Sequence, residues 1–262
     1  MRLIVYVLIG TMLLISNGSH AAVAITKVSL AVDHGPPYSQ ISDSGEITGA
    51  IVDIFQLMQQ QLDFKLELVG CPFSRCIRML ENGEVNAMGG LILTPERQKL
   101  MQFVTPPYMV ITSSFVFYAR HESKLEIKHY DDLYGKKIAI MRGAAYFKRF
   151  NEDDKLIKVP VLTEKTAIDL LVKGRVDLVV GIESTTDHAM SVLNQPVNNL
   201  VKMQYRHSDT IYGFLALSKS FADTDLAKRI DVELKKMADS GELTKLVAPY
   251  KLPAVDRESL GF

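Results

Sequence analysis

The chain has 262 residues, and its 30 Lys and Arg residues equal its 30 Asp and Glu residues, so its formal net charge is zero. This balance excludes the basic surface typical of nucleic-acid-binding proteins, and no nucleic acid is expected as a partner. A hydrophobic content of 47% is enough to fill the core of one large domain or of two domains of ordinary size.

The N-terminal segment has the pattern of a secretory signal peptide. Arg2 supplies a positive charge, residues 3–15 form an apolar run, and small and polar residues then lead to Ala21 and Ala22. The apolar run is shorter than the ~20 residues of a membrane-spanning helix. We predict that residues 1–21 are a signal peptide and that the protein is periplasmic; an uncleaved membrane anchor is the alternative.

Strand and helix patterns alternate along the rest of the chain. The first unit has predicted strands over 27–32, 64–69, 85–91 and 113–119, helices over 49–62 and 74–82, and a helical turn at 95–97. The second has strands over 137–141, 176–180 and 213–218, and helices over 144–150, 163–172 and 223–236. This alternation predicts an α/β fold with mostly parallel sheets.

The two cysteines of the chain, Cys71 and Cys76, lie close together in the sequence. Such a pair in an exported protein predicts a disulfide bond. Two free thiols are the alternative, because a disulfide requires Cα atoms within ~7 Å. No third or fourth ligand stands nearby and the histidines lack metal-ligand spacing, so we expect no metal and no cofactor.

A series of different short motifs is spread along almost the whole chain after residue 21. They are PPY at 36–38, GEITG at 45–49, LENGEVNA at 80–87, LTPER at 93–97, DLYGKKI at 132–138, LVKGRVD at 171–177 and SGEL at 240–243. Each is weak alone, but the ordered set resembles family 3 extracellular solute-binding proteins, the polar amino-acid receptors of ATP-driven importers.

The resemblance implies an α/β, two-lobed periplasmic-binding-protein-like (type II) clamp with two crossover strands, over 113–120 and 206–212. Residues 22–117 and 213–262 are then expected in lobe 1, and residues 118–212 in lobe 2. The function implied is capture of a small polar ligand, an amino acid or a small carboxylate, for the membrane permease of an ABC importer. A monomer is expected.

The resemblance also places Arg97 where the family has the arginine that binds the ligand carboxylate. A guanidinium meets a carboxylate in two parallel hydrogen bonds, which suits this role; a surface arginine paired with Glu96 is the alternative. Phe73 and Tyr38 are expected as walls of the site, although either could belong to the core. Arg75 is expected either as a second cation or as an exposed helix residue.

Two glycine loops complete the expected site. Gly89 and Gly90 allow a ligand to approach the backbone closely. Gly143 and Ala144 match the family's loop at a helix start, where backbone N–H groups favour an anion.

Three departures from the family pattern limit the assignment of the ligand. Alanines follow Gly143 where a hydroxyl residue is frequent, Ile92 occupies another hydroxyl position, and Ile182 stands where an aspartate pairs with the ligand ammonium. Because a buried ammonium needs a carboxylate, Glu183 is expected to substitute, with Asp33 and Asp187 as alternatives.

Two other functions stay open. An enzyme similar to cyclohexadienyl dehydratases would use Glu183 as a general acid, and a sensor module would pass its ligand state to a membrane partner. The sequence contains no G-x-S-x-G, H-E-x-x-H or P-loop motif, which favours a binding protein without catalysis.

Overall fold

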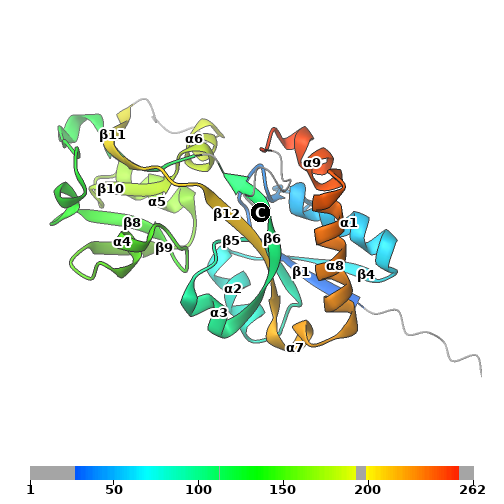
Figure 1. Cartoon of the computed structure of the whole chain (residues 1–262). Helices are drawn as coiled ribbons and strands as arrows, with labels where there is room; N and C mark the ends of the chain where they lie inside the picture. The colour runs from blue at the N-terminus through cyan, green and yellow to red at the C-terminus, as the bar shows by residue number, and fades with distance from the viewer. Residues whose placement is uncertain (1–26, 112, 193–198, 254–262) are drawn as a thin grey trace, which may run out of the picture.

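The computed structural model describes residues 27–111, 113–192 and 199–253, so the predicted signal peptide lies outside the described residues. The described chain forms two lobes that lie side by side, each built on a five-stranded sheet (Figure 1). The predicted two-lobed α/β clamp is confirmed, but the expectation of mostly parallel sheets is wrong, because each sheet joins two parallel and two antiparallel strand pairings. Among the described helices, none combines the length and the apolar character needed to cross a membrane.

The first lobe contains both ends of the described chain. Its sheet has the order β4-β1-β5-β12-β6; β1 is parallel to β4 and β5, and β12 is antiparallel to β5 and β6. The strands are β1 (Lys27–Val32), β4 (Lys65–Gly70), β5 (Ala87–Leu91), β6 (Met101–Ile111) and β12 (Ile211–Ser218), with a small hairpin of β2 (Gln40–Ile41) and β3 (Ile47–Thr48). The helices are α1 (Ala50–Leu62), α2 (Phe73–Glu81), α3 (Pro95–Leu100), α7 (Lys219–Ala222), α8 (Asp225–Asp239) and α9 (Glu242–Val247).

The second lobe is built from the middle of the chain. Its sheet has the order β11-β7-β10-β8-β9, in which β8 is parallel to β9 and β10, and β7 is antiparallel to β10 and β11. The strands are β7 (Phe115–Arg120), β8 (Lys137–Met141), β9 (Ile157–Val161), β10 (Leu178–Ile182) and β11 (Leu200–His207), and the helices are α4 (Lys148–Glu152), α5 (Glu164–Val172) and α6 (Glu183–Val192).

The chain passes between the lobes twice. β6 ends in the first sheet at Ile111 and β7 begins in the second at Phe115, while β11 ends at His207 and β12 begins at Ile211. The whole of β7 therefore belongs to the second sheet. The predicted lobe boundary at residue 117 would instead cut β7 in two. We propose that the lobes divide at these two short passages, which lie side by side because Ile111 pairs with Ile211.

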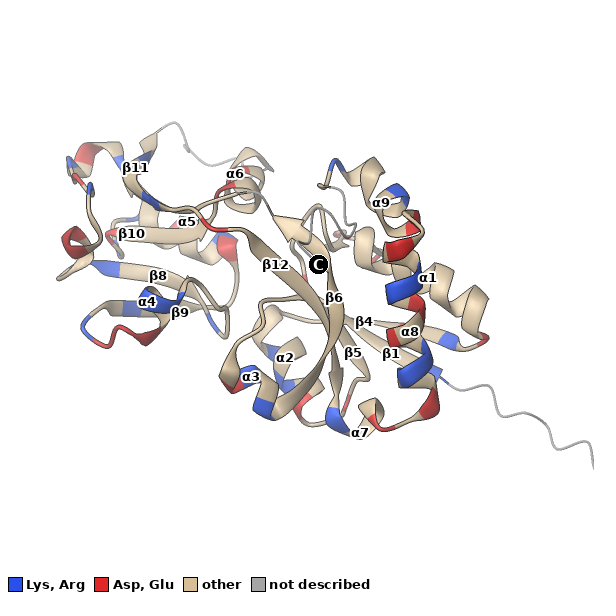
Figure 2. Ribbon diagram, viewed as in Figure 1, with Lys and Arg blue, Asp and Glu red and all other residues tan. Residues whose placement is uncertain are grey.

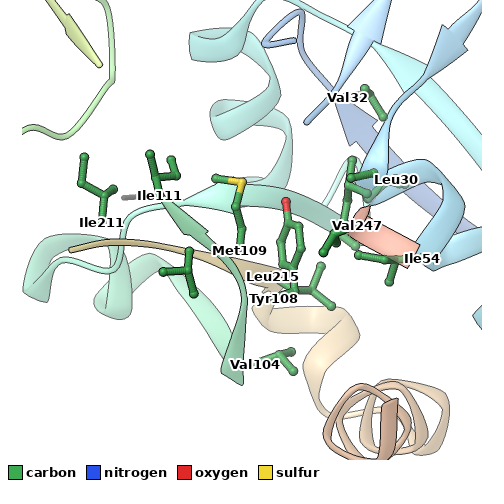
Figure 3. Close-up of a cluster of buried hydrophobic side chains, with 14 of the residues drawn as sticks. Leu30, Val32, Ile54, Val104, Tyr108, Met109, Ile111, Ile211, Leu215 and Val247 are labelled. Carbon is green, nitrogen blue, oxygen red and sulfur yellow. The ribbon is translucent and has the colours of Figure 1, made fainter. Parts of the chain in front are cut away.

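The first-lobe strands β5, β6 and β12 are apolar next to the passages. Tyr108, Met109, Ile111 and Ile211 belong to one buried cluster that continues to Leu30 in β1 (Figure 3). β5, β6 and β12 carry no charged residue, whereas charged residues are frequent on the helices, α8 above all (Figure 2). On the first-lobe side, a charge that reaches the space between the lobes therefore comes from a loop or from a helix.

Candidate functional site

A cavity of about 170 Å³ lies between the lobes. One water occupies only ~10–15 Å³ of such a volume, so the cavity has room for a larger ligand. The first lobe lines it with the loop after β1, with β5 and with parts of β6 and α3; the second lobe adds the end of β8 and the starts of α5 and α6. Of the predicted site residues, those that line the cavity are Tyr38, Phe73, Gly89, Gly90, Arg97 and Ala144.

Arg97 is buried beside this cavity, with 8% of its surface exposed. The hydroxyl of Thr94 caps α3 by accepting a hydrogen bond from the Arg97 backbone N–H. The guanidinium Nη1 donates to the Ile92 carbonyl at 2.7 Å, and Nη2 donates to the Gly143 carbonyl of the opposite lobe at 2.8 Å. The side chain is therefore held between the two lobes.

The charge of Arg97 has no carboxylate within ion-pair distance among the described residues. Burial lowers the pKa of the guanidinium to about 10, and the charge of Glu81 opposes this change. At neutral pH the group remains a buried cation bonded to carbonyls, and the alternative of a surface pair with Glu96 does not apply. A guanidinium has five N–H donors, so two backbone acceptors leave others free for a carboxylate ligand.

The predicted disulfide is present and supports one wall of the cavity. Cys71 and Cys76 are bonded, with Cα atoms 5.5 Å apart. Because α2 begins at Phe73, the disulfide encloses the residues that lead into this helix. The Phe73 ring centroid lies 6.0 Å from the guanidinium carbon of Arg97, so the aromatic wall adjoins the cation.

Tyr38 and Gly89 form part of the first-lobe side. Burial raises the pKa of the Tyr38 hydroxyl to about 12, so the phenol is neutral at physiological pH. A Cβ atom at Gly89 would lie 2.5 Å from the Tyr108 hydroxyl oxygen and 2.6 Å from Ile51 Cγ1. Gly89 is therefore required by the packing of its own lobe, besides lining the cavity.

The predicted helix over 144–150 is wrong at its start. α4 begins at Lys148, and Ala144 lies in a turn in which its N–H donates to the Met141 carbonyl at 3.1 Å. The Asn151 side chain bonds both the N–H and the carbonyl of Tyr146, which holds this residue outside the helix. Ala144 thus offers no helix-start N–H to an anion, and Gly143 contributes its carbonyl to Arg97 instead.

Arg75 and Glu183 lie outside the cavity lining. Arg75 is exposed on α2. Glu183 is the first residue of α6, and its carboxylate binds Lys202 Nζ at 2.8 Å and Arg206 Nη1 at 3.4 Å, with 25% of the side chain exposed. Both cations come from β11, so the sheet pairing of the second lobe draws this carboxylate away from the ligand site. The expectation that Glu183 contacts the ligand has no support in this geometry.

Two other carboxylates line the cavity. Asp33 follows β1, and the Ser39 hydroxyl donates to its Oδ1 at 3.4 Å. Burial raises the pKa of Asp33 to about 6, against the lowering effect of hydrogen bonds from its own backbone N–H and from Ser39. Glu164, the first residue of α5, accepts a hydrogen bond from the Thr186 hydroxyl at 3.1 Å.

Glu164 was missed because an acidic residue after the N-cap Thr163 is common in the first turn of any helix. Its position after β9 was the available signal. Ligands of open α/β sheets bind beyond the carboxyl ends of the strands, and β9 is a parallel strand. Burial raises the pKa of Glu164 and the negative charge of Asp33 adds to this rise, while the hydroxyls of Thr186 and Thr185 oppose it.

Comparison with known proteins finds mostly solute-binding proteins, although a membrane-bound lytic murein transglycosylase F of Ectopseudomonas mendocina is also 25% identical over 177 residues. The profile of bacterial extracellular solute-binding proteins, family 3, matches residues 28–253. The amino-acid-binding protein AabA of Dichelobacter nodosus is 28% identical over 220 residues, which are 82% of this chain and 83% of that protein. The ABC transporter arginine-binding protein 1 of Escherichia coli K12 is 28% identical over 171 residues, or 64% of this chain and 68% of that one. The structure of holo ArgBP from T. maritima superposes with a TM-score of 0.67 and 25% identity, covering 87% of this chain and 96% of that one.

Proposed function

The chain belongs to the bacterial extracellular solute-binding proteins, family 3, and on this premise we propose that its cavity captures an amino acid by the carboxylate. The observation that carries the proposal is Arg97, a buried cation between the lobes whose described hydrogen-bond acceptors are two backbone carbonyls. A ligand carboxylate compensates such a cation better than neutral carbonyls do, because hydrogen bonds between charged groups are roughly twice as strong.

The remaining groups of the cavity suit the rest of an amino acid. Tyr38 and Phe73 present aromatic surface to a side chain, and Asp33 supplies a negative charge for a cationic group. The relative from Escherichia coli is named an arginine-binding protein, so arginine and lysine are the first ligands to test.

We further propose that the protein works as a monomer in the periplasm and delivers its ligand to the permease of an ABC importer. Binding without catalysis is the role favoured by the site. Glu183, the acid that a dehydratase-like reaction would need, is neutralised by Lys202 and Arg206 away from the cavity.

The proposal is tested by a thermal-shift screen of the purified mature protein against the L-amino acids, polyamines and small carboxylates. A ligand present at 100 times its Kd raises the free energy of unfolding by ~2.7 kcal/mol, which is a clear shift. We expect an amino acid to stabilise the protein and agmatine, which is arginine without its carboxylate, to have no effect. Stabilisation by agmatine but by no amino acid would overturn the role assigned to Arg97.

A further inference from the structure

The two lobes contribute unequally to the charge of the cavity. Its second-lobe lining in the described chain consists of Met141, Ala144, Ala145, Glu164, Ile182 and Thr185, and Glu164 alone among them is charged. The first lobe supplies the cation Arg97 and the acid Asp33. A ligand that bridges the lobes through charges therefore meets Glu164 on the second-lobe side.

The carboxylate of Glu164 is held in place by its neighbours. The Thr186 hydroxyl, which is 1% exposed, donates to Glu164 Oε1. Gly181 of β10 makes this contact possible, because a Cβ there would lie 2.1 Å from Thr186 Oγ1 and 3.6 Å from Glu164 Oε1. Three elements, α5, α6 and β10, thus meet to fix one acidic group at the cavity wall.

Holding the Glu164 carboxylate at the cavity wall is electrostatically unfavourable, and a cationic group of a ligand would relieve this. Glu164 has no cationic partner among the described residues, and Asp33 faces the same cavity from the other lobe with the same sign of charge. A buried charge without a counter-charge is unfavourable. With both carboxylates ionised and Arg97 protonated, the cavity carries one surplus negative charge, which a ligand with one surplus positive charge would neutralise.

We propose that Glu164 is the second lobe's ligand-binding residue and pairs with the α-ammonium of the amino acid whose carboxylate lies on Arg97. This assignment rests on the proposed function. Glu164 would provide the negative charge for the ammonium close to Ile182, where the family pattern has an aspartate. Its Oε1 lies near Gly181, the residue before Ile182. This assignment leaves Asp33 for a cationic side chain, so amino acids with basic side chains are the preferred ligands.

The test compares amino acids with analogues that lack only the α-amine. The pairs are L-lysine with 6-aminohexanoate, L-arginine with 5-guanidinopentanoate, and L-glutamine with 4-carbamoylbutanoate, each titrated by calorimetry into the wild type and into Glu164→Gln. In the wild type we expect the tightest amino acid to bind roughly 30-fold or more tightly than its analogue. In Glu164→Gln this ratio should fall to about threefold or less, as a double-mutant cycle requires for a direct contact.

Two variants and one control guard against a folding effect. Glu164→Asp keeps the charge and should retain an intermediate ratio, while Thr186→Val removes the donor that orients the carboxylate and should lower the ratio less than Glu164→Gln does. Glu152→Gln makes the same chemical change at an exposed site of the same lobe and should bind like the wild type. Melting temperatures of all variants verify folding.

The outcomes separate this inference from the proposed function. An unchanged ratio in folded Glu164→Gln overturns the role of Glu164, while loss of binding in Arg97→Ala alone keeps the proposed function. Equal affinity of the wild type for an amino acid and its analogue also overturns the ammonium assignment. Failure of all the amino acids to bind overturns the proposed function itself, and this inference with it.

Discussion

The starts of α5 and α6 make an informative pair, because each of these two helices begins with a glutamate directly after a strand or a short turn. Glu164 points to the cavity between the lobes and is bonded to a threonine hydroxyl. Glu183 binds two cations of β11 at the surface. The local sequence pattern is the same, so the contacts of the neighbouring elements decide which acid is available to a ligand.

The comparison also shows why nearness in sequence is a poor guide to replacement. Glu183 adjoins Ile182 along the chain, and this proximity suggested that it takes over the ammonium. Glu164 is distant in sequence, yet its carboxylate lies against β10 beside Gly181. Both helix starts line the cavity, through Glu164 of α5 and Thr185 of α6. Of the two first residues, only that of α5 directs its carboxylate there, because the carboxylate of Glu183 is bonded to β11.

The largest expected effect comes from Arg97, the cation that lines the same cavity as Glu164. Arg97→Ala should weaken amino-acid binding by about 3 kcal/mol, more than a hundredfold, because it removes the charged partner of the ligand carboxylate. Isothermal titration calorimetry measures the change. The exposed Arg75 is the matched control, and Arg75→Ala should bind normally; equal losses in both variants would contradict the site described above.

Removing the disulfide tests how much it stabilises the segment of the first lobe that carries Phe73. Replacing Cys71 and Cys76 by serine should lower the free energy of unfolding by about 2 kcal/mol, since a short closed loop is lost, and the melting temperature by roughly 4–8 °C. Calorimetric unfolding of both proteins measures this. A ligand affinity that falls in parallel would show that the loop also orients Phe73, whereas an unchanged melting temperature would contradict a stabilising role.

The pH dependence of ligand affinity tests whether ionised acids in the cavity attract a cationic ligand. Burial raises the pKa of Asp33 from 3.8 to about 6, so a cationic ligand should bind about tenfold more weakly at pH 5 than at pH 7.5, where this carboxyl is ionised. The stability of the ligand-free protein depends on pH in the opposite direction to ligand affinity. The contribution of Asp33 to the free energy of unfolding is full below pH 3.8 and is lost as the pH rises through 6. Arginine is a suitable ligand, because its guanidinium stays protonated throughout.

A matched pair of variants isolates Asp33 in that measurement. His34 follows Asp33 in the sequence and also lines the cavity, so its substitution is the matched control. Asp33→Asn should reduce the pH dependence of arginine binding, leaving the part that Glu164 contributes because burial raises its pKa as well, while His34→Gln should leave the pH dependence in place. The reverse result would assign the pH dependence to the histidine.

The smallest effect is expected from the surface acid. Glu183→Gln should change ligand affinity less than twofold and the free energy of unfolding by at most about 1 kcal/mol, because partly exposed ion pairs contribute little. Calorimetry and thermal unfolding measure the two quantities. A large loss of binding in Glu183→Gln, with Glu164→Gln unaffected, would reverse the comparison between the two glutamates.

Much of the fold followed from the sequence, because it depends on local patterns. Apolar periodicity placed β1, α1, β4, α2, β8, α5 and α8 within a few residues of their observed bounds, and the close cysteine pair is bonded. The sequence patterns did not predict β6, β9 or α6. After Gly143 the helix begins later than predicted, because a side chain five residues ahead, Asn151, binds the backbone of Tyr146.

The sequence by itself determined many of the helices and strands, the disulfide and the ordered motifs that lead to Arg97. Only the tertiary structure decided which acids share its cavity. Asp33 and Glu164 belong to different lobes and line the same cavity because the chain crosses between the lobes twice. Glu183 is held away from it because β11 returns beside α6 with two cations. Strand and helix patterns arise from neighbours along the chain, whereas the charge of a cavity arises from side chains that only the packing of two lobes brings together.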